Sequence, residues 1–287
     1  MPRDQVLINS QHYKGGSSYV YKLPHPITFT KDSKVSLYSF SMYNSTYNIS
    51  ASLGNNTFSI KWLGNTFLYT IPDGYYSYND LNNFLQYCML TNGLYVLKGT
   101  SPVYFISLTS NAPQYSAQIN ITFIPCIDAS GNTPQTTYGY TIPQGAGWTF
   151  PTYAQGNKTP QLIISSGLQS ILGFQGGQNT FPTTVLNTNK NFTSTALPIL
   201  SPVYCYVLHC NLVQSSYNNV PTVFQQVPIN VSYGGLINFI NPTPQSINIR
   251  EGVYSDITIW ISDQYYNPVQ FKDWELTLAL LIDTPEK

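Results

Sequence analysis

The sequence predicts a predominantly antiparallel β-sheet protein, an all-β sandwich that includes one or two helices. Residues 34–43 alternate apolar and polar side chains over a length that suits one long strand. Residues 203–213 are apolar on both faces at first, as expected of a strand buried in a sandwich. Residues 256–261 and 274–280 are strand-like and flank a turn at 263–268, so we expect them to form an antiparallel pair.

The first 18 residues lack apolar periodicity and end in a run of Gly and Ser. We therefore expect residues 1–18 to form a mobile N-terminal arm. The alternative is that residues 5–9 form a strand at a sheet edge, because Val6, Leu7 and Ile8 could pair there. Thermal melting of a truncated protein distinguishes the two, since losing a strand lowers the midpoint and losing an arm does not.

A hairpin and a helix follow the first long strand. Residues 57–62 and 66–71 suit two strands joined by Leu63-Gly64-Asn65. Ser77 and Asp80 form a capping-box pattern, and apolar residues then recur at spacings of three and four, which predicts a helix at about 78–92. This segment has no Lys or Arg, so we expect it to pack on a sheet. A second, shorter helix is predicted over residues 166–172.

Residues 128–161 are rich in Gly, Pro, Gln, Thr and Tyr, which predicts a long surface loop. Trp148 and Phe150 are large apolar residues within it. They either pin the loop to its own domain, which we favour, or contact a neighbouring molecule.

The strand patterns at both ends of the chain, with a helix between them, predict a divided domain. We expect residues 19–52 and 190–287 to share one β-sandwich and residues 53–189 to form an inserted, outward-facing α+β subdomain. The alternative is one continuous domain over residues 19–287.

Charge and composition favour an assembling protein. Only 8% of residues are charged, the net formal charge is zero and the chain contains 24 Tyr. A neutral surface with many Tyr residues associates readily, and it lacks the field that would hold nucleic acid phosphates. The first residues lack a signal-peptide pattern and no apolar run approaches a membrane span, so we expect synthesis in the cytoplasm without a signal peptide and no membrane span.

Catalytic patterns are missing from the sequence. Between residues 99 and 249 the formally charged residues are Asp128, Lys158 and Lys190. The histidines and cysteines of the chain are His12, His25, His209, Cys88, Cys126, Cys205 and Cys210. They show no metal-ligand spacing and no C-x-x-C pair, the sequence has no G-x-S-x-G nucleophile elbow, and His209 suits a core or interface position. We therefore predict that the protein is not an enzyme and has no catalytic, cofactor-binding or metal residues and no cofactor.

Several short motifs occur in an order that resembles a known family. They are Val35-Ser36-Leu37-Tyr38-Ser39-Phe40, Ile71-Pro72-Asp73-Gly74-Tyr75-Tyr76, Leu172-Gly173-Phe174, Cys210-Asn211-Leu212 with Ser216-Tyr217-Asn218, Ile257-Thr258-Ile259-Trp260-Ile261 and Val269-Gln270-Phe271. In this order they resemble the single jelly-roll penton, or minor capsid, proteins of virophages and of Polinton and adintovirus elements. The long loop at 128–161 departs from the family pattern.

The resemblance implies a single jelly roll that forms homopentamers at the fivefold vertices of an icosahedral virus particle. Its expected neighbours are double jelly-roll major capsid proteins, its expected location is the virion, and the family has no catalytic residues. Two alternatives remain at this stage. One is another vertex protein, such as an adaptor or spike, and the other is a carbohydrate-binding β-sandwich, for which Tyr, Trp and Asn are suitable contact residues.

Overall fold

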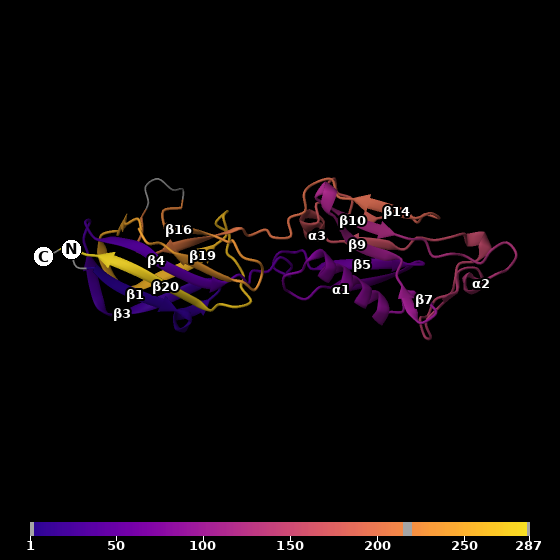
Figure 1. Cartoon of the computed structure of the whole chain (residues 1–287), viewed down its shortest axis with the longest axis horizontal. Helices are drawn as coiled ribbons and strands as arrows, with labels where there is room; N and C mark the ends of the chain where they lie inside the picture. Colours follow the sequence, from indigo (N-terminus) through magenta and orange to yellow (C-terminus); the bar gives the residue numbers. More distant parts are fainter. Residues whose placement is uncertain (1–2, 215–219, 286–287) are drawn as a thin grey trace. The chain divides into compact units, whose positions relative to one another are not determined.

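A computed structural model describes residues 3–214 and 220–285 and confirms the predicted β-rich fold, in which three α-helices occur among the described residues (Figure 1). The chain divides into two compact units. We call residues 1–47 and 201–287 the terminal unit and residues 48–200 the inserted unit. These boundaries differ from the predicted ones, which placed residues 48–52 and 190–200 in the first domain. The Ser216-Tyr217-Asn218 motif lies outside the described residues.

The terminal unit contains two antiparallel sheets. The first has the order β1 (Arg3–Asn9), β20 (Leu276–Asp283), β4 (Lys34–Tyr43) and β17 (Leu236–Ile240), with β18 (Ile247–Asn248) also paired to β4. The second has the order β16 (Val223–Pro228), β15 (Cys205–Cys210), β19 (Gly252–Ser262), β3 (Ser18–Phe29) and β2 (Tyr13–Gly15). In chain order the eight main strands move between the sheets as in a jelly roll, which places the predicted sandwich here.

The alternation of apolar and polar side chains predicted for residues 34–43 is present in β4, and it is interrupted once, where the strand bulges. Val35, Leu37, Phe40 and Met42 all lie in the core between the sheets. The ladder with β20 shifts register between Leu37 and Ser39, so Tyr38 is the extra residue of a bulge. The bulge allows Leu37 and Phe40, three positions apart, to point to the same side.

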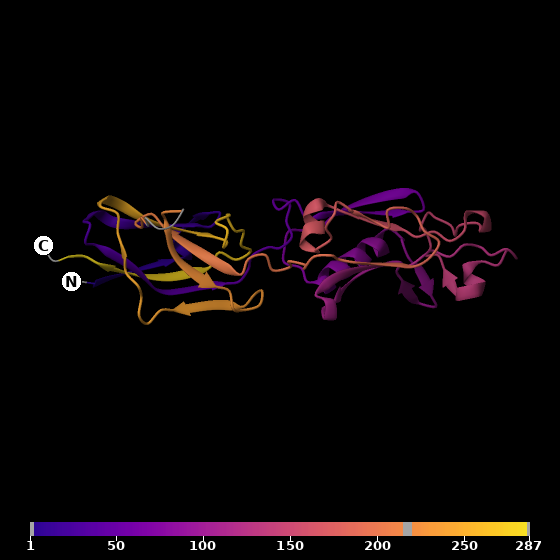
Figure 2. The ribbon, with the colours of Figure 1, turned by 90° about the horizontal axis from the view of Figure 1, so that it is seen from above.

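The predicted mobile arm over residues 1–18 is wrong. β1 pairs with β20 along its whole length, from Arg3 opposite Asp283 to Asn9 opposite Thr277. The Ile8 side chain is fully buried in the core, and the Arg3 Nε lies 2.7 Å from the Asp283 Oδ1. β1 begins and β20 ends at the same end of the terminal unit (Figure 2). The edge-strand alternative is therefore correct, because the sheet edge formed by β20 supplies partners that the isolated segment lacks.

The predicted antiparallel pair of residues 256–261 and 274–280 is also wrong. β19 pairs with β3 and β15 in the second sheet, whereas β20 pairs with β1 and β4 in the first. Asp263 closes a local turn by accepting hydrogen bonds from the backbone of Tyr265 and Asn267, both at 2.8 Å. The chain then crosses to the other sheet, because both edges of β19 are already paired, one with β3 and the other with β15.

The inserted unit has its own core around helix α1 (Tyr78–Thr91), which packs on β9 (Ile106–Asn111) and lies beside β5 (Thr57–Trp62) (Figure 1). The predicted helix is confirmed, with its capping box formed by Ser77 and Asp80.

The remaining elements of the inserted unit are β6 (Asn65–Thr70), β7 (Val96–Lys98), β8 (Ser101–Val103), β10 (Ser116–Ile121), α2 (Pro134–Tyr138), β11 (Tyr140–Thr141), β12 (Gln161–Ile164), α3 (Ser166–Ile171), β13 (Thr180–Phe181) and β14 (Lys190–Thr193). They form sheets of order β13-β12-β5-β6, β14-β10-β9 and β11-β7-β8. No helix among the described residues is long and apolar enough to span a membrane.

The predicted hairpin is present as β5 and β6, and its turn is tighter than expected. Leu63 and Gly64 both have positive φ angles, of 46° and 98°, as a two-residue type I′ turn requires. Asn65 therefore belongs to β6. Within the long segment 128–161, α2 and β11 are short and most residues have no regular structure.

Candidate interaction surfaces

The histidine and cysteine side chains are dispersed across the fold. His12 lies in the turn after β1, His25 is exposed on β3 and His209 is buried in β15. Within residues 3–214 and 220–285, no group of three His, Cys, Asp or Glu side chains could hold a metal ion. Burial raises the pKa of the Cys88 thiol to about 11 and that of Cys210 to about 12, so both are protonated near neutral pH.

His209 is a buried polar residue on the second sheet. Its ring stacks on Trp260 with centroids 5.0 Å apart, its Nε2 lies 2.8 Å from the Ser262 Oγ and its Nδ1 lies 3.2 Å from the Thr222 Oγ1. Ser262 donates its own proton to the Asp263 carbonyl at 3.2 Å, so its oxygen is free to accept from Nε2. Burial lowers the pKa of His209. The arrangement suits a neutral imidazole that holds strands together.

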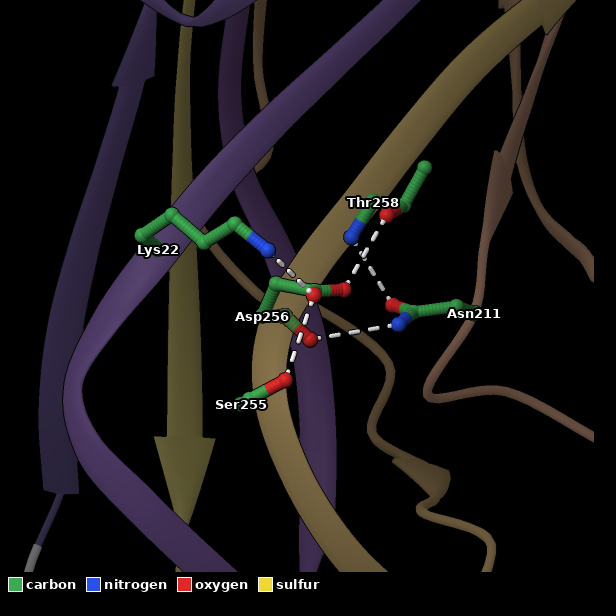
Figure 3. Close-up of polar contacts among 5 residues, drawn as sticks. All are labelled: Lys22, Asn211, Ser255, Asp256 and Thr258. Atoms are coloured by element: carbon green, nitrogen blue, oxygen red, sulfur yellow. Dashed lines mark hydrogen bonds and ion pairs between the residues drawn. The ribbon is translucent and has the colours of Figure 1, made fainter.

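An ion pair and three polar side chains meet where the register between β3 and β19 shifts (Figure 3). The Lys22 Nζ lies 2.9 Å from the Asp256 Oδ2, and Ser255 and Thr258 donate to the same carboxylate. Asn211 donates to the Asp256 carbonyl at 3.2 Å and accepts from the Thr258 amide at 2.9 Å. The hydrogen bond from Lys22 lowers the pKa of Asp256. The cluster joins β3, β19 and the end of β15, so we assign it a structural role.

The outer face of the first sheet carries a surface without charge. One row across the four strands runs from Leu7 through Ala279 and Ser39 to Ile240. The next row consists of Asn9, Thr277, Ser41 and Asn238. We call these eight residues the neutral face. Leu7 and Ile240, at its two edges, are 55% and 58% exposed, while the residues between them are small or polar. Such an uncharged surface with exposed apolar edges suits contact with another protein.

A recess of about 530 Å³ lies within the inserted unit, between the turn of the β5–β6 hairpin and the long loop. Its lining residues include Lys61, Lys158, Trp148 and Phe150, together with residues that carry amides and hydroxyls, and they include no Asp or Glu. Trp148 donates from Nε1 to the Gly93 carbonyl at 2.6 Å and packs edge-on against Trp62, with centroids 5.2 Å apart. These contacts confirm that Trp148 pins the loop to its own unit. We call this hollow the lysine recess.

Sequence reasoning singled out parts of these surfaces but not their assembly. The sequence predicts that Trp148 pins the loop and shows Lys158 as one of few charges, yet neither pattern places these residues in one recess with Lys61. The available signal was compositional: residues 48–200 contain four lysines, and two of them line one recess. The neutral face could not be found in this way, since its residues come from four strands distant in sequence.

Comparisons with known proteins add a distant structural similarity. No protein-family model and no curated protein matches the chain. Among solved structures, the chain is similar to the crystal structure of a mavirus penton protein, with 12% sequence identity and a TM-score of 0.42. The similarity covers 99% of this chain and 100% of that one. Because the TM-score is low, the assignment of the jelly roll rests on the strand order of the terminal unit itself.

Proposed function

We propose that this protein is a structural capsid subunit that forms homopentamers at the fivefold vertices of an icosahedral virus particle, beside double jelly-roll major capsid proteins. The observation that carries the proposal is the eight-stranded jelly roll of the terminal unit, closed by β1 and β20 from the two ends of the chain. The ordered motifs that resemble penton proteins support it. The inserted unit, which joins β4 to β15, is in this proposal the part presented outward.

The neutral face is the surface that we assign to one side of the contact between subunits. A ring of five requires heterologous contacts, in which one patch of each subunit meets a different patch of the next. The neutral face has no charge to desolvate, and its exposed edges at Leu7 and Ile240 supply apolar contact area. The Lys22–Asp256 ion pair of the second sheet is costlier to bury, so we place that side outside the principal contact.

Native mass spectrometry and negative-stain imaging of the purified protein test the proposal. We expect pentamers, and we expect Leu7→Lys and Ile240→Lys each to shift the population towards monomers without lowering the melting temperature of the protein. Val253→Lys is the matched control, because Val253 is also exposed, at 69%, but lies on β19 of the second sheet. It should leave the pentamer intact.

A wild-type protein that stays monomeric at micromolar and higher concentrations would argue for a lectin-like module instead. Pentamers that survive both substitutions on the neutral face, but not Val253→Lys, would move the contact to the second sheet. Particles that incorporate the protein away from their vertices would contradict the penton position and favour an adaptor role.

A further inference from the structure

We propose that the lysine recess of the inserted unit binds an acidic saccharide, that is, a sugar ring carrying a carboxylate or sulfate group. The recess lies wholly within residues 61–185, and its volume of about 530 Å³ is in the range of small-molecule sites. The inference does not rest on the capsid role, because it concerns a different unit and other residues.

The charge of the recess selects an anion. Lys61 projects from the exposed side of β5, and Lys158 is held by two backbone hydrogen bonds with Ile124, at 2.8 and 3.1 Å. In the described part of the chain, neither lysine side chain has an ion pair or hydrogen bond. The three acidic residues of the inserted unit, Asp73, Asp80 and Asp128, do not line the recess. Two lysines without an acidic partner therefore line one concavity, and their positive charge favours an anionic ligand there.

The aromatic side chains of the recess suit a ring. Trp148 is fixed by its hydrogen bond to Gly93 and by edge-on packing against Trp62 and Phe150, the latter at 5.6 Å between centroids. Trp148 and Phe150 are both half-buried, so part of each ring remains accessible. A rigid aromatic surface is preorganised to contact the apolar face of a sugar, so its side chains lose little conformational entropy when the sugar binds.

The remaining lining groups suit hydroxyls. Asn65, Thr149 and Gln155 are exposed and line the recess. Amide and hydroxyl side chains both donate and accept hydrogen bonds, as a polyhydroxylated ligand requires. An aromatic ring, neutral amides and two lysines together match a sugar that has one acidic substituent.

Saturation-transfer NMR and calorimetry with 3′-sialyllactose and with a sulfated chondroitin disaccharide test the inference. Lactose and the unsulfated disaccharide serve as neutral counterparts. We expect at least one acidic sugar to bind about tenfold or more tightly than its neutral counterpart, and Lys61→Gln and Lys158→Gln each to weaken it about tenfold, as for loss of a charge-assisted hydrogen bond. Higher salt should weaken binding as well.

The controls come from the same unit. Lys98→Gln and Lys190→Gln remove the two lysines that do not line the recess, and both should leave binding unchanged. Four results would each overturn the inference: equal loss with these control variants, equal binding of neutral sugars, tighter binding of adenosine monophosphate, or no binding of either acidic sugar at millimolar concentration. Because all four lysine variants are assayed at one temperature below their melting transitions, misfolding does not confuse the comparison.

Discussion

In both units of this protein, polar side chains join segments that are distant in the chain. The two units use different kinds of polar group. The terminal unit contains eight Lys or Arg and nine Asp or Glu, whereas the inserted unit contains four Lys and three Asp. In the terminal unit, ion pairs link strands: Arg3 pairs with Asp283 and Lys22 pairs with Asp256. The inserted unit uses amides instead.

Those amides are buried and hydrogen-bonded. Asn48 is completely buried, donates to the carbonyls of Tyr76 and Leu200 at 2.8 and 2.9 Å, and accepts from the Tyr76 amide at 2.8 Å. Gln161, 4% exposed, donates to the carbonyl of Pro182 at 2.8 Å. A neutral amide costs far less to remove from water than a charge, so it can tie segments together inside a unit where an ion pair would be expensive.

The units also differ in how they are closed. The terminal unit depends on pairing between the first and last strands, whereas the first and last residues of the inserted unit meet directly, through the hydrogen bond from Asn48 to Leu200. Because each unit has its own core, we expect two separable unfolding transitions. Changes that affect only one transition can then test the comparison.

Deletion of residues 1–9 should have the largest effect. It removes a strand with seven backbone pairs and the fully buried Ile8, leaving β20 as an unpaired edge over an open core. Loss of Ile8 alone corresponds to about 2–5 kcal/mol of unfolding free energy. We expect the transition of the terminal unit to be lost or strongly lowered in calorimetry, while that of the inserted unit stays in place.

The single change Arg3→Gln is the control for this deletion, since it removes the Arg3–Asp283 ion pair and keeps the strand. It should lower the midpoint less than the deletion does, because the backbone pairing of β1 and the buried Ile8 remain, although the Asp283 carboxylate, in a residue only 8% exposed, loses its partner. If the deletion melts like the intact protein, the closing role of β1 is contradicted.

Gly173→Ala should destabilise the inserted unit. Gly173 has a φ angle of +77°, and a Cβ there would lie 2.3 Å from the Ala196 carbonyl oxygen. Gly177 has nearly the same φ angle, +76°, but a Cβ there would have no neighbour within 4 Å. We expect Gly177→Ala to cost about 1–2 kcal/mol for the left-handed conformation, and Gly173→Ala to cost about 1–3 kcal/mol more for the close contact.

Chemical denaturation followed by tryptophan fluorescence measures both glycine variants, since Trp62 and Trp148 lie in the inserted unit. Equal losses for the two variants would show that the backbone near Ala196 moves aside, and a loss in the transition of the terminal unit would show that the two units do not unfold separately.

Sequence reasoning succeeded where structure is decided locally. The helix at Tyr78–Thr91 follows from its capping box and apolar spacing, and the β5–β6 hairpin follows from its turn residues. It failed where the choice of partner depends on register across the chain. Residues 1–18 lack apolar periodicity and look too polar to order alone, and the strand-like patterns at 256–261 and 274–280 suggest a hairpin, although β1, β19 and β20 each pair elsewhere.

The candidate surfaces show the same limit. Trp148 could be expected to anchor its loop, because a large apolar side chain must be covered. The sequence could not predict that Lys61 and Lys158 line the same recess as Trp148, because this depends on the path of an irregular loop. The neutral face needs the complete strand order, and a shift of one residue would turn Leu7 inward and Ile8 outward.

The smallest predicted effect concerns pH and the buried ring of His209. Burial lowers its pKa in the folded protein below the ordinary value of about 6.5, so the unfolded chain binds a proton more readily than the folded one. Its contribution to stability is therefore fully present above pH 6.5 and is lost as the pH falls towards the lowered folded-state pKa. We expect the midpoint of the terminal unit to fall between pH 7 and pH 5.

His209→Gln provides the comparison, because glutamine is polar but does not titrate. Its contacts to Trp260, Ser262 and Thr222 change, so the variant should be less stable at every pH, yet its midpoint should depend less on pH between 7 and 5. His25→Gln, at an exposed position on β3, should keep the wild-type dependence. The inserted unit contains no histidine, so its transition serves as an internal reference over the same range. A terminal-unit midpoint that falls equally in wild type and His209→Gln would assign the acid sensitivity to its carboxylates, such as Asp283, whose pKa is lowered by the hydrogen bond from Arg3.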